Sequence, residues 1–282
     1  MKILIYGAGI VGTTYGWQLS KAGHEIAVLV RPEKKQATKE EGIHIHCADF
    51  RGGKKEIEDI VFKPDVIDSL SADNNFEYII VTTNNLHLKE ILPVLSKSAG
   101  NAHILFFQNM WIDDLDSINK YLSEKQYFFG FPFMVGGGRD AGCIYSAISG
   151  LKQSHTPLGE PNGEISERVR KIADAFEDAN LKPIIYNQIK IWLITHYAVA
   201  AGLSAGIMKA KSGRNFASNS DILKEAIKAI REGLEALCLM FDGHTQHSPD
   251  EMKKMFEDII TDGEKHGVKV YILKQIKEGI FN

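Results

Sequence analysis

The stretch that decides the fold is residues 2–12, Lys-Ile-Leu-Ile-Tyr-Gly-Ala-Gly-Ile-Val-Gly. A short, mostly apolar strand leads into a glycine loop, and the loop opens an amphipathic helix expected over residues 10–21. Gly7 permits a tight turn, Gly9 lets the backbone approach a diphosphate, and Gly12 lets the helix pack closely. Amides at the start of such a helix face the phosphates. The alternative is a purely structural glycine turn. We expect a dinucleotide to contact Gly7, Ala8, Gly9, Ile10, Val11 and Gly12.

The residues after this loop alternate between strand and helix patterns. Strands are expected at residues 2–6, 25–30, 77–82 and 102–107, with a helix at 86–97. This alternation predicts an α/β fold with a Rossmann-like, doubly wound parallel sheet. Residues 42–64 are more irregular, and 54–62 suit an antiparallel insertion.

A helical pattern replaces the alternation from about residue 163. Helices are expected at 164–179, 187–208, 221–240 and 249–266. Residues 159–163, Gly-Glu-Pro-Asn-Gly, are the best candidate linker. We therefore predict a dinucleotide-binding domain over 1–162 and an all-helical domain over 163–282, which serves substrate binding or dimerisation.

The end of the second strand indicates which dinucleotide binds. An NAD site commonly has an acidic residue here to hold the ribose hydroxyls, whereas this chain has Arg31 followed by Pro32. A guanidinium suits the 2′-phosphate of NADP through forked, charge-assisted hydrogen bonds. Lys34 and Lys35 extend the positive rim. NADP is therefore the expected cofactor, the alternative being that Arg31 is a solvated loop residue.

Composition excludes several classes of function. The 282 residues are 44% hydrophobic and carry 33 Lys and Arg against 36 Asp and Glu, a net charge of -3. So balanced a chain has no electrostatic footprint for nucleic acid or for an anionic membrane. Polar residues interrupt the longest apolar run, 191–208, which favours a buried helix over a membrane span. The apolar start is too short for a signal peptide.

The cysteines and histidines suggest neither a disulfide framework nor a metal site. Cys47, Cys143 and Cys238 are odd in number and far apart. His44 and His46 alternate on an expected strand without a clear third ligand. We expect a cytoplasmic protein.

Residues 136–140, Gly-Gly-Gly-Arg-Asp, are expected to form a flexible loop that lines the cofactor or joins a hairpin.

Several motifs together resemble the ketopantoate reductase family (2-dehydropantoate 2-reductases). They are the glycine loop, the strand ending at Arg31, the Val-Thr-Thr strand end at 81–83, the Phe-Gln-Asn strand end at 107–109, and the helical second half. The resemblance implies NADPH-dependent reduction of a small 2-oxo acid in pantothenate biosynthesis, in a cleft between the two domains. A homodimer is consistent with it.

Residue by residue, the resemblance gives a mixed set of cofactor contacts. Asn109 matches the family asparagine that bonds the nicotinamide ribose or the substrate. Asn84 stands after the strand end where the family has a lysine near the cofactor. Glu251 falls where a cofactor-contacting glutamate is expected, counted back from residues 266–267.

The helix over 187–208 departs from the family. The positions of the proton-donating lysine and of two asparagines are Leu193, Tyr197 and Ala201. Reduction of a ketone still needs an acid near the forming alkoxide. Lys190, one turn before Leu193, and the phenol of Tyr197 are the candidates, although either can equally be a structural residue.

Three functions therefore stay open. The first is a reductase of ketopantoate or a related small carbonyl compound. The second, motivated by the apolar Leu193 and Ala201, is a catalytically degenerate NADP-binding sensor or scaffold. The third is an opine-type or 3-hydroxy acid dehydrogenase, which shares the two-domain plan.

Overall fold

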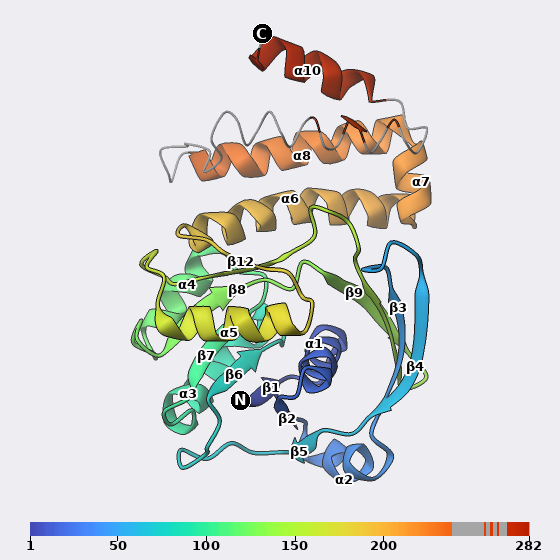
Figure 1. The fold of residues 1–282 in the computed structure, drawn as a ribbon. Helices are drawn as coiled ribbons and strands as arrows, with labels where there is room; N and C mark the ends of the chain where they lie inside the picture. Colours follow the sequence, from blue (N-terminus) through green and yellow to red (C-terminus); the bar gives the residue numbers. More distant parts are fainter. Residues whose placement is uncertain (239–256, 258–259, 262–263, 265–269, 282) are drawn as a thin grey trace. The chain divides into compact units, whose positions relative to one another are not determined.

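The computed structural model describes residues 1–238, 257, 260–261, 264 and 270–281 (Figure 1). These residues belong to two compact units, Met1–Leu234 and Glu235–Asn282. The first unit contains both β-sheets and every residue that lines the cavity described below.

The main sheet has eight strands. They are β1 (Lys2–Tyr6), β2 (Glu25–Leu29), β5 (Asp65–Ile67), β6 (Tyr78–Val81), β7 (His103–Phe107), β8 (Tyr127–Gly130), β11 (Thr156–Gly159) and β12 (Pro183–Ile185). Their order is β12-β11-β8-β7-β6-β1-β2-β5, and all neighbours are parallel except β11 and β8. The chain runs outward from β1 in both directions, so a topological switch point lies between β1 and β6.

Helices cover both faces of this sheet (Figure 1). One hydrophobic core joins it to α1 (Ile10–Lys21) and α5 (Glu167–Asp178), and another joins it to α3 (Leu88–Ser98) and α4 (Ile112–Asn119). All four residues of β6 are buried, as expected for a strand covered on both sides. The predicted Rossmann-like, doubly wound fold is confirmed.

A second, four-stranded sheet packs against α1. Its order is β4 (Glu56–Phe62), β3 (Ile43–Asp49), β10 (Cys143–Ile148) and β9 (Val135–Asp140). The antiparallel pairing of β3 with β4 confirms the expected insertion. The flexible loop expected at 136–140 is wrong, because these glycines form β9 of an antiparallel hairpin with β10.

The linker expected at 159–163 is also wrong. Gly159 ends β11, and a Cβ there would lie 2.3 Å from the Tyr186 carbonyl oxygen. Glu160 is buried and paired with Arg168 of α5. The sheet then continues beyond residue 162 to β12, while the domain boundary at that residue stays a prediction.

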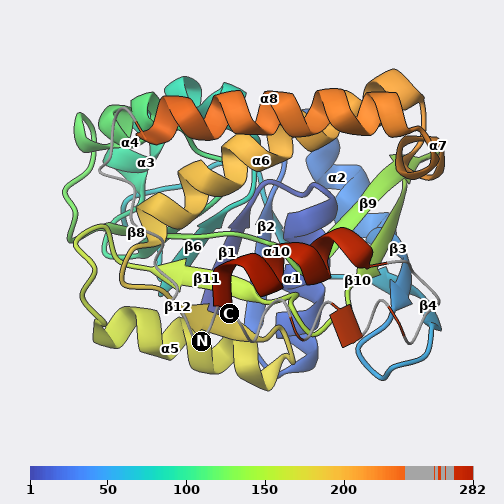
Figure 2. The same ribbon diagram turned by 90° about the horizontal axis from the view of Figure 1, so that it is seen from above.

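The helices that follow the sheet are α6 (Ile189–Ala210), α7 (Gly213–Ser218), α8 (Ser220–Cys238) and α10 (Tyr271–Phe281). Figure 2 shows α6 and α8 crossing each other. Glycines permit that approach: a Cβ on Gly202 would lie 2.5 Å from Ile230 Cγ1, and one on Gly206 would lie 3.0 Å from Ala226 Cβ. Most of the helix predicted at 249–266 lies outside the described residues.

Of the helices described, α6 alone is long and apolar enough, by length and composition, to cross a membrane. Its buried residues recur about every four positions and therefore lie on one face, so the expectation of a wholly buried helix holds for that face only. The cytoplasmic location and the homodimer stay predictions. Two short helices complete the described elements, α2 (Pro32–Glu41) and η1 (Asn85–His87).

Candidate functional site

The glycine loop has the geometry that its sequence predicts. Gly7 follows β1 with φ at +119°, a conformation that strains any residue with a side chain. A Cβ on Gly12 would lie 2.3 Å from Thr82 Oγ1 and 2.4 Å from the Gly7 carbonyl oxygen, so only glycine lets α1 pack here. A Cβ on Gly9 would meet no heavy atom within 4 Å. The second glycine therefore faces open space, where a ligand can approach the backbone.

Polar side chains at the ends of β6 and β7 support this loop. Thr82 donates a hydrogen bond from Oγ1 to the Gly7 carbonyl oxygen at 2.8 Å. Gln108, which is buried, donates from Nε2 to the Thr83 carbonyl oxygen at 2.6 Å. These bonds join the residues that follow the carboxyl ends of β1, β6 and β7. Open α/β sheets bind ligands at this edge, beside the switch point.

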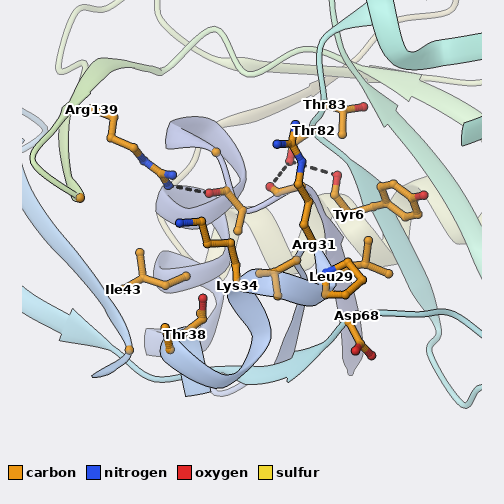
Figure 3. A pocket seen from close by; sticks show the side chains of 18 of the residues that line it. Tyr6, Leu29, Arg31, Lys34, Thr38, Ile43, Asp68, Thr82, Thr83 and Arg139 are labelled. Atoms are coloured by element: carbon orange, nitrogen blue, oxygen red, sulfur yellow. Dashed lines mark hydrogen bonds between the residues drawn. The ribbon is translucent and has the colours of Figure 1, made fainter. Parts of the chain in front are cut away.

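A cavity of about 1250 Å³ opens at this edge (Figure 3). It extends from the glycine loop past the end of β2 to the start of α2, and the β9–β10 hairpin closes another side. Its size suits a large ligand such as a dinucleotide. The first turn of α1 holds no acidic residue, and no side chain caps its amides, which suits an anionic group.

The charges around the cavity favour phosphate. Arg31, Lys34 and Arg139 line it, and none of them forms an ion pair with a described carboxylate. Two of the lining acids are paired: Asp68 accepts a bond from Lys35 at 2.9 Å, and Glu90 lies 3.1 Å from His87. Hydrogen bonding to Lys35 lowers the pKa of Asp68, which is therefore ionised at neutral pH. The third lining acid is Glu41.

Arg31 occupies the position that the sequence predicts. It is the N-cap residue of α2, its side chain is exposed, and α2 continues with Pro32 and then Lys34 on the cavity side. Sequence reasoning did not anticipate Asp68, which β5 brings beside the end of β2. An acid is thus near the ribose position, but its partner Lys35 offsets its charge.

Arg139 belongs to the segment 136–140 that the sequence offered either as a lining of the cofactor site or as a hairpin connection, but no individual contact was predicted for it. Its Nη2 donates to the Ala8 carbonyl oxygen at 2.8 Å, although the two residues are 131 positions apart. The only sequence signal was the glycine run before it.

The structure gathers some of the predicted cofactor residues and leaves others apart. Five line the cavity: Gly7, Ala8, Gly9, Arg31 and Asn84. Ile10, Val11 and Gly12 begin α1 beside it. Asn109 is exposed at the end of β7, and Glu251 lies outside the described residues. The roles given to all of these residues stay predictions.

The predicted proton donors lie on α6. Leu193, at the position of the family lysine, is buried in the core with Ile189. Lys190 is exposed in the first turn. Tyr197 is half-buried, with its ring centroid 5.5 Å from that of Trp111, which follows the end of β7. Of the two candidates, Tyr197 therefore contacts the residues at the ligand-binding edge.

An aromatic cluster surrounds His196 at the same edge. Its ring is 4.2 Å from that of Phe131, which directly follows β8, and stacks on Trp192 at 5.1 Å. Burial lowers the pKa of His196 and of His155, whose Nε2 lies 3.0 Å from the Tyr186 hydroxyl. Both imidazoles are therefore neutral at pH 7.

The doubly wound fold, its switch point and the glycine loop are together typical of a dinucleotide-binding protein. Residues 3–159, more than half of the chain, match the family model of ketopantoate reductase PanE/ApbA. The chain belongs to this family.

Individual relatives are distant. The chain is 26% identical over 196 residues to the uncharacterized oxidoreductase YkpB of Bacillus subtilis (strain 168), a match that covers 68% of this chain and 60% of that protein's length. It is 26% identical over 293 residues to the 2-dehydropantoate 2-reductase of Aquifex aeolicus (strain VF5), a match that covers 99% of this chain and 86% of that protein's length. The solved structure of D-mandelate dehydrogenase with NADH and anilino(oxo)acetate is similar in fold, with a TM-score of 0.57, 19% identity, and coverage of 99% and 97%.

Proposed function

We propose that this protein is an NADP-dependent oxidoreductase that reduces a small 2-oxo acid, ketopantoate or a related carbonyl compound, to the hydroxy acid. The observation that carries the proposal is the cavity at the glycine loop, which Arg31 and Lys34 line without an ion-pair partner among the described residues. Membership of the ketopantoate reductase family supports the reaction type.

In this proposal, different residues bind different parts of the cofactor. Amides of the glycine loop and of the first turn of α1 hold the diphosphate, and Arg31 holds the 2′-phosphate. Asn84 and Asn109, which follow the neighbouring strands β6 and β7, are the proposed contacts of the reactive half of the cofactor. Glu251, which is outside the described residues, is a further proposed contact. The nicotinamide, when bound, supplies the hydride.

The chain itself must supply the proton. The hydroxyl of Tyr197 is a hydrogen-bond donor, so in this proposal it gives its proton to the forming alkoxide and recovers a proton from water. Its ring contact with Trp111, which follows β7, supports this role, whereas Lys190 is exposed in the first turn of α6. We therefore favour Tyr197 and retain Lys190 as the second candidate.

One observation favours a different function. Leu193 occupies the position of the family lysine. Its side chain is apolar and buried, so this position supplies no proton donor. A protein that binds NADPH without hydride transfer, serving as a sensor or scaffold, is the second candidate.

Spectrophotometry at the NADPH absorption band separates the two functions. The purified protein is mixed with NADPH and each member of a panel of 2-oxo acids that includes ketopantoate. The reductase predicts NADPH consumption with at least one acid and a reduced kcat in Tyr197→Phe, with Lys190→Met as the matched comparison. NADPH binding without consumption in any reaction would establish the sensor. Consumption that requires an amino acid co-substrate would indicate an opine-type enzyme.

A further inference from the structure

Arg139 reaches the glycine loop from a different part of the fold. It lies on β9, the edge strand of the small sheet, one residue before the turn of the β9–β10 hairpin. Alternate residues of a strand share a face, so Arg139 projects on the same side as Gly137 and Val135. Val135 belongs to the core formed with α1. Arg139 therefore faces the start of α1, where it bonds to the Ala8 carbonyl oxygen (Figure 3).

Most of the hydrogen-bonding capacity of Arg139 remains available. A guanidinium has five N–H donors, and among the described residues the side chain of Arg139 donates one hydrogen bond, to the Ala8 carbonyl oxygen. No described carboxylate pairs with it, and the side chain lines the cavity. A bare cation beside the open space at Gly9 is what a phosphate-binding site requires.

The position separates Arg139 from the other two cations. Arg31 and Lys34 lie at the end of β2 and the start of α2, where the ribose 2′-position is expected. Arg139 instead touches the glycine loop itself, where the diphosphate is expected. NADP and NAD differ at the ribose 2′-position, near Arg31 and Lys34, and have the same diphosphate, near Arg139.

We infer that Arg139 is a cofactor-binding residue that contacts the diphosphate shared by both dinucleotides, while Arg31 distinguishes between them. This inference rests on the proposed function. The bond to Ala8 orders the loop and holds the guanidinium in place, so the hairpin and the glycine loop form one phosphate site.

The test compares dissociation constants for NADPH and NADH, measured by fluorescence titration, in Arg139→Ala and in Arg31→Ala. Loss of a charge-assisted contact predicts that Arg139→Ala raises both constants by a similar factor, about 10- to 100-fold. Arg31→Ala raises the constant for NADPH alone. Arg170→Ala, which removes an exposed arginine from α5, controls for net charge and leaves both constants unchanged.

A second substitution separates phosphate binding from loop ordering. Glutamine can donate an N–H to the Ala8 carbonyl oxygen but carries no charge. Arg139→Gln therefore stays as weak as Arg139→Ala if the guanidinium binds phosphate. Recovery of wild-type binding in Arg139→Gln would overturn the inference and leave a structural tether.

The remaining outcomes are equally decisive. Unchanged constants in Arg139→Ala, or an effect on NADPH alone, would overturn the inference while leaving the proposed function intact. If the wild-type protein binds neither dinucleotide, the proposed function itself fails. Thermal melts of each variant without cofactor identify any variant that does not fold. If Arg139→Ala does not fold, Arg139→Lys, which keeps the charge, is measured in its place. We expect it to bind both dinucleotides less tightly than the wild type, by a smaller factor than that given for Arg139→Ala.

Discussion

Replacing Gly12 with alanine tests the contact between α1 and β6. The new methyl group would lie 2.3 Å from Thr82 Oγ1 and 2.4 Å from the Gly7 carbonyl oxygen, whereas ordinary Cβ contacts begin at 3.4 Å. The start of α1 must therefore move by about 1 Å. Overpacking of this kind costs about 1–3 kcal/mol. At roughly 2–4 °C per kcal/mol, the melting temperature falls by about 2–12 °C.

The same shift disturbs the cofactor site, because Gly7 and Gly12 belong to one loop. We expect Gly12→Ala to weaken NADPH binding as well as stability. Gly9→Ala is the matched control. Its methyl group enters open space, so the melting temperature stays near that of the wild type. That methyl group occupies the space through which the diphosphate approaches the backbone, so NADPH binding weakens in this variant too.

Thermal melts and NADPH titrations on both variants give the answer. The account predicts that Gly12→Ala loses stability and binding, and that Gly9→Ala loses binding alone. Thr82→Ala removes one of the three atoms that clash with the new methyl group, the third being Ile5 Cγ2 at 2.7 Å, so the double variant with Gly12→Ala recovers part of the lost stability. An unchanged melting temperature in Gly12→Ala would refute the packing argument. Wild-type NADPH affinity in Gly9→Ala would refute the assignment of the open space.

Three further predictions concern selectivity and stability. Arg31→Ala weakens NADPH by about 10- to 100-fold in isothermal titration, because a charge-assisted contact is lost, and leaves NADH unchanged; equal losses would show that Arg31 does not read the phosphate. Arg168→Met removes the cationic partner of the buried Glu160 carboxylate, which keeps only its hydrogen bond from Ser166 among the described side chains, and lowers the free energy of unfolding by about 3–5 kcal/mol in urea titrations. A loss of less than 1 kcal/mol would mean that water reaches the carboxylate. Burial holds the pKa of His155 and of His196 below 6.5, so the unfolded chain takes up more protons beneath that pH. The free energy of unfolding therefore falls as the pH is lowered from 6.5 to 5, and His196→Phe makes that fall smaller. The same pH dependence in His196→Phe and in the wild type would contradict the lowered pKa of His196.

Local patterns predicted the cofactor half well. The tasks of Gly7, Gly9 and Gly12 follow from a strand, a turn and a helix that are adjacent in sequence, and the structure places each glycine accordingly. The helix at 10–21 was predicted with the bounds that α1 has. Short-range physics determines these features.

Long-range pairing explains what the sequence did not reveal. Arg139 reaches the loop only because β10 pairs with β3, a register in which Ile144 lies opposite Ile45. Residues 159–163 have the composition of a linker, but the partner that buries Glu160 lies on the next helix. The three residues of β12 are too few for a periodic pattern.

The acid on the substrate side shows the same limit. Sequence spacing identified Leu193 and Tyr197 as neighbours on one face of α6, and the structure buries the first while the second contacts Trp111. His196 also has a close ring contact with Phe131, which is 65 positions away. No spacing rule along α6 predicts that contact.

Calorimetric titration of the purified wild-type protein with NADPH is the measurement on which this account depends most. The loop, the cavity and the unpaired cations predict saturable binding of one dinucleotide per chain, tighter for NADPH than for NADH. The absence of any heat or fluorescence change at millimolar NADPH would contradict it.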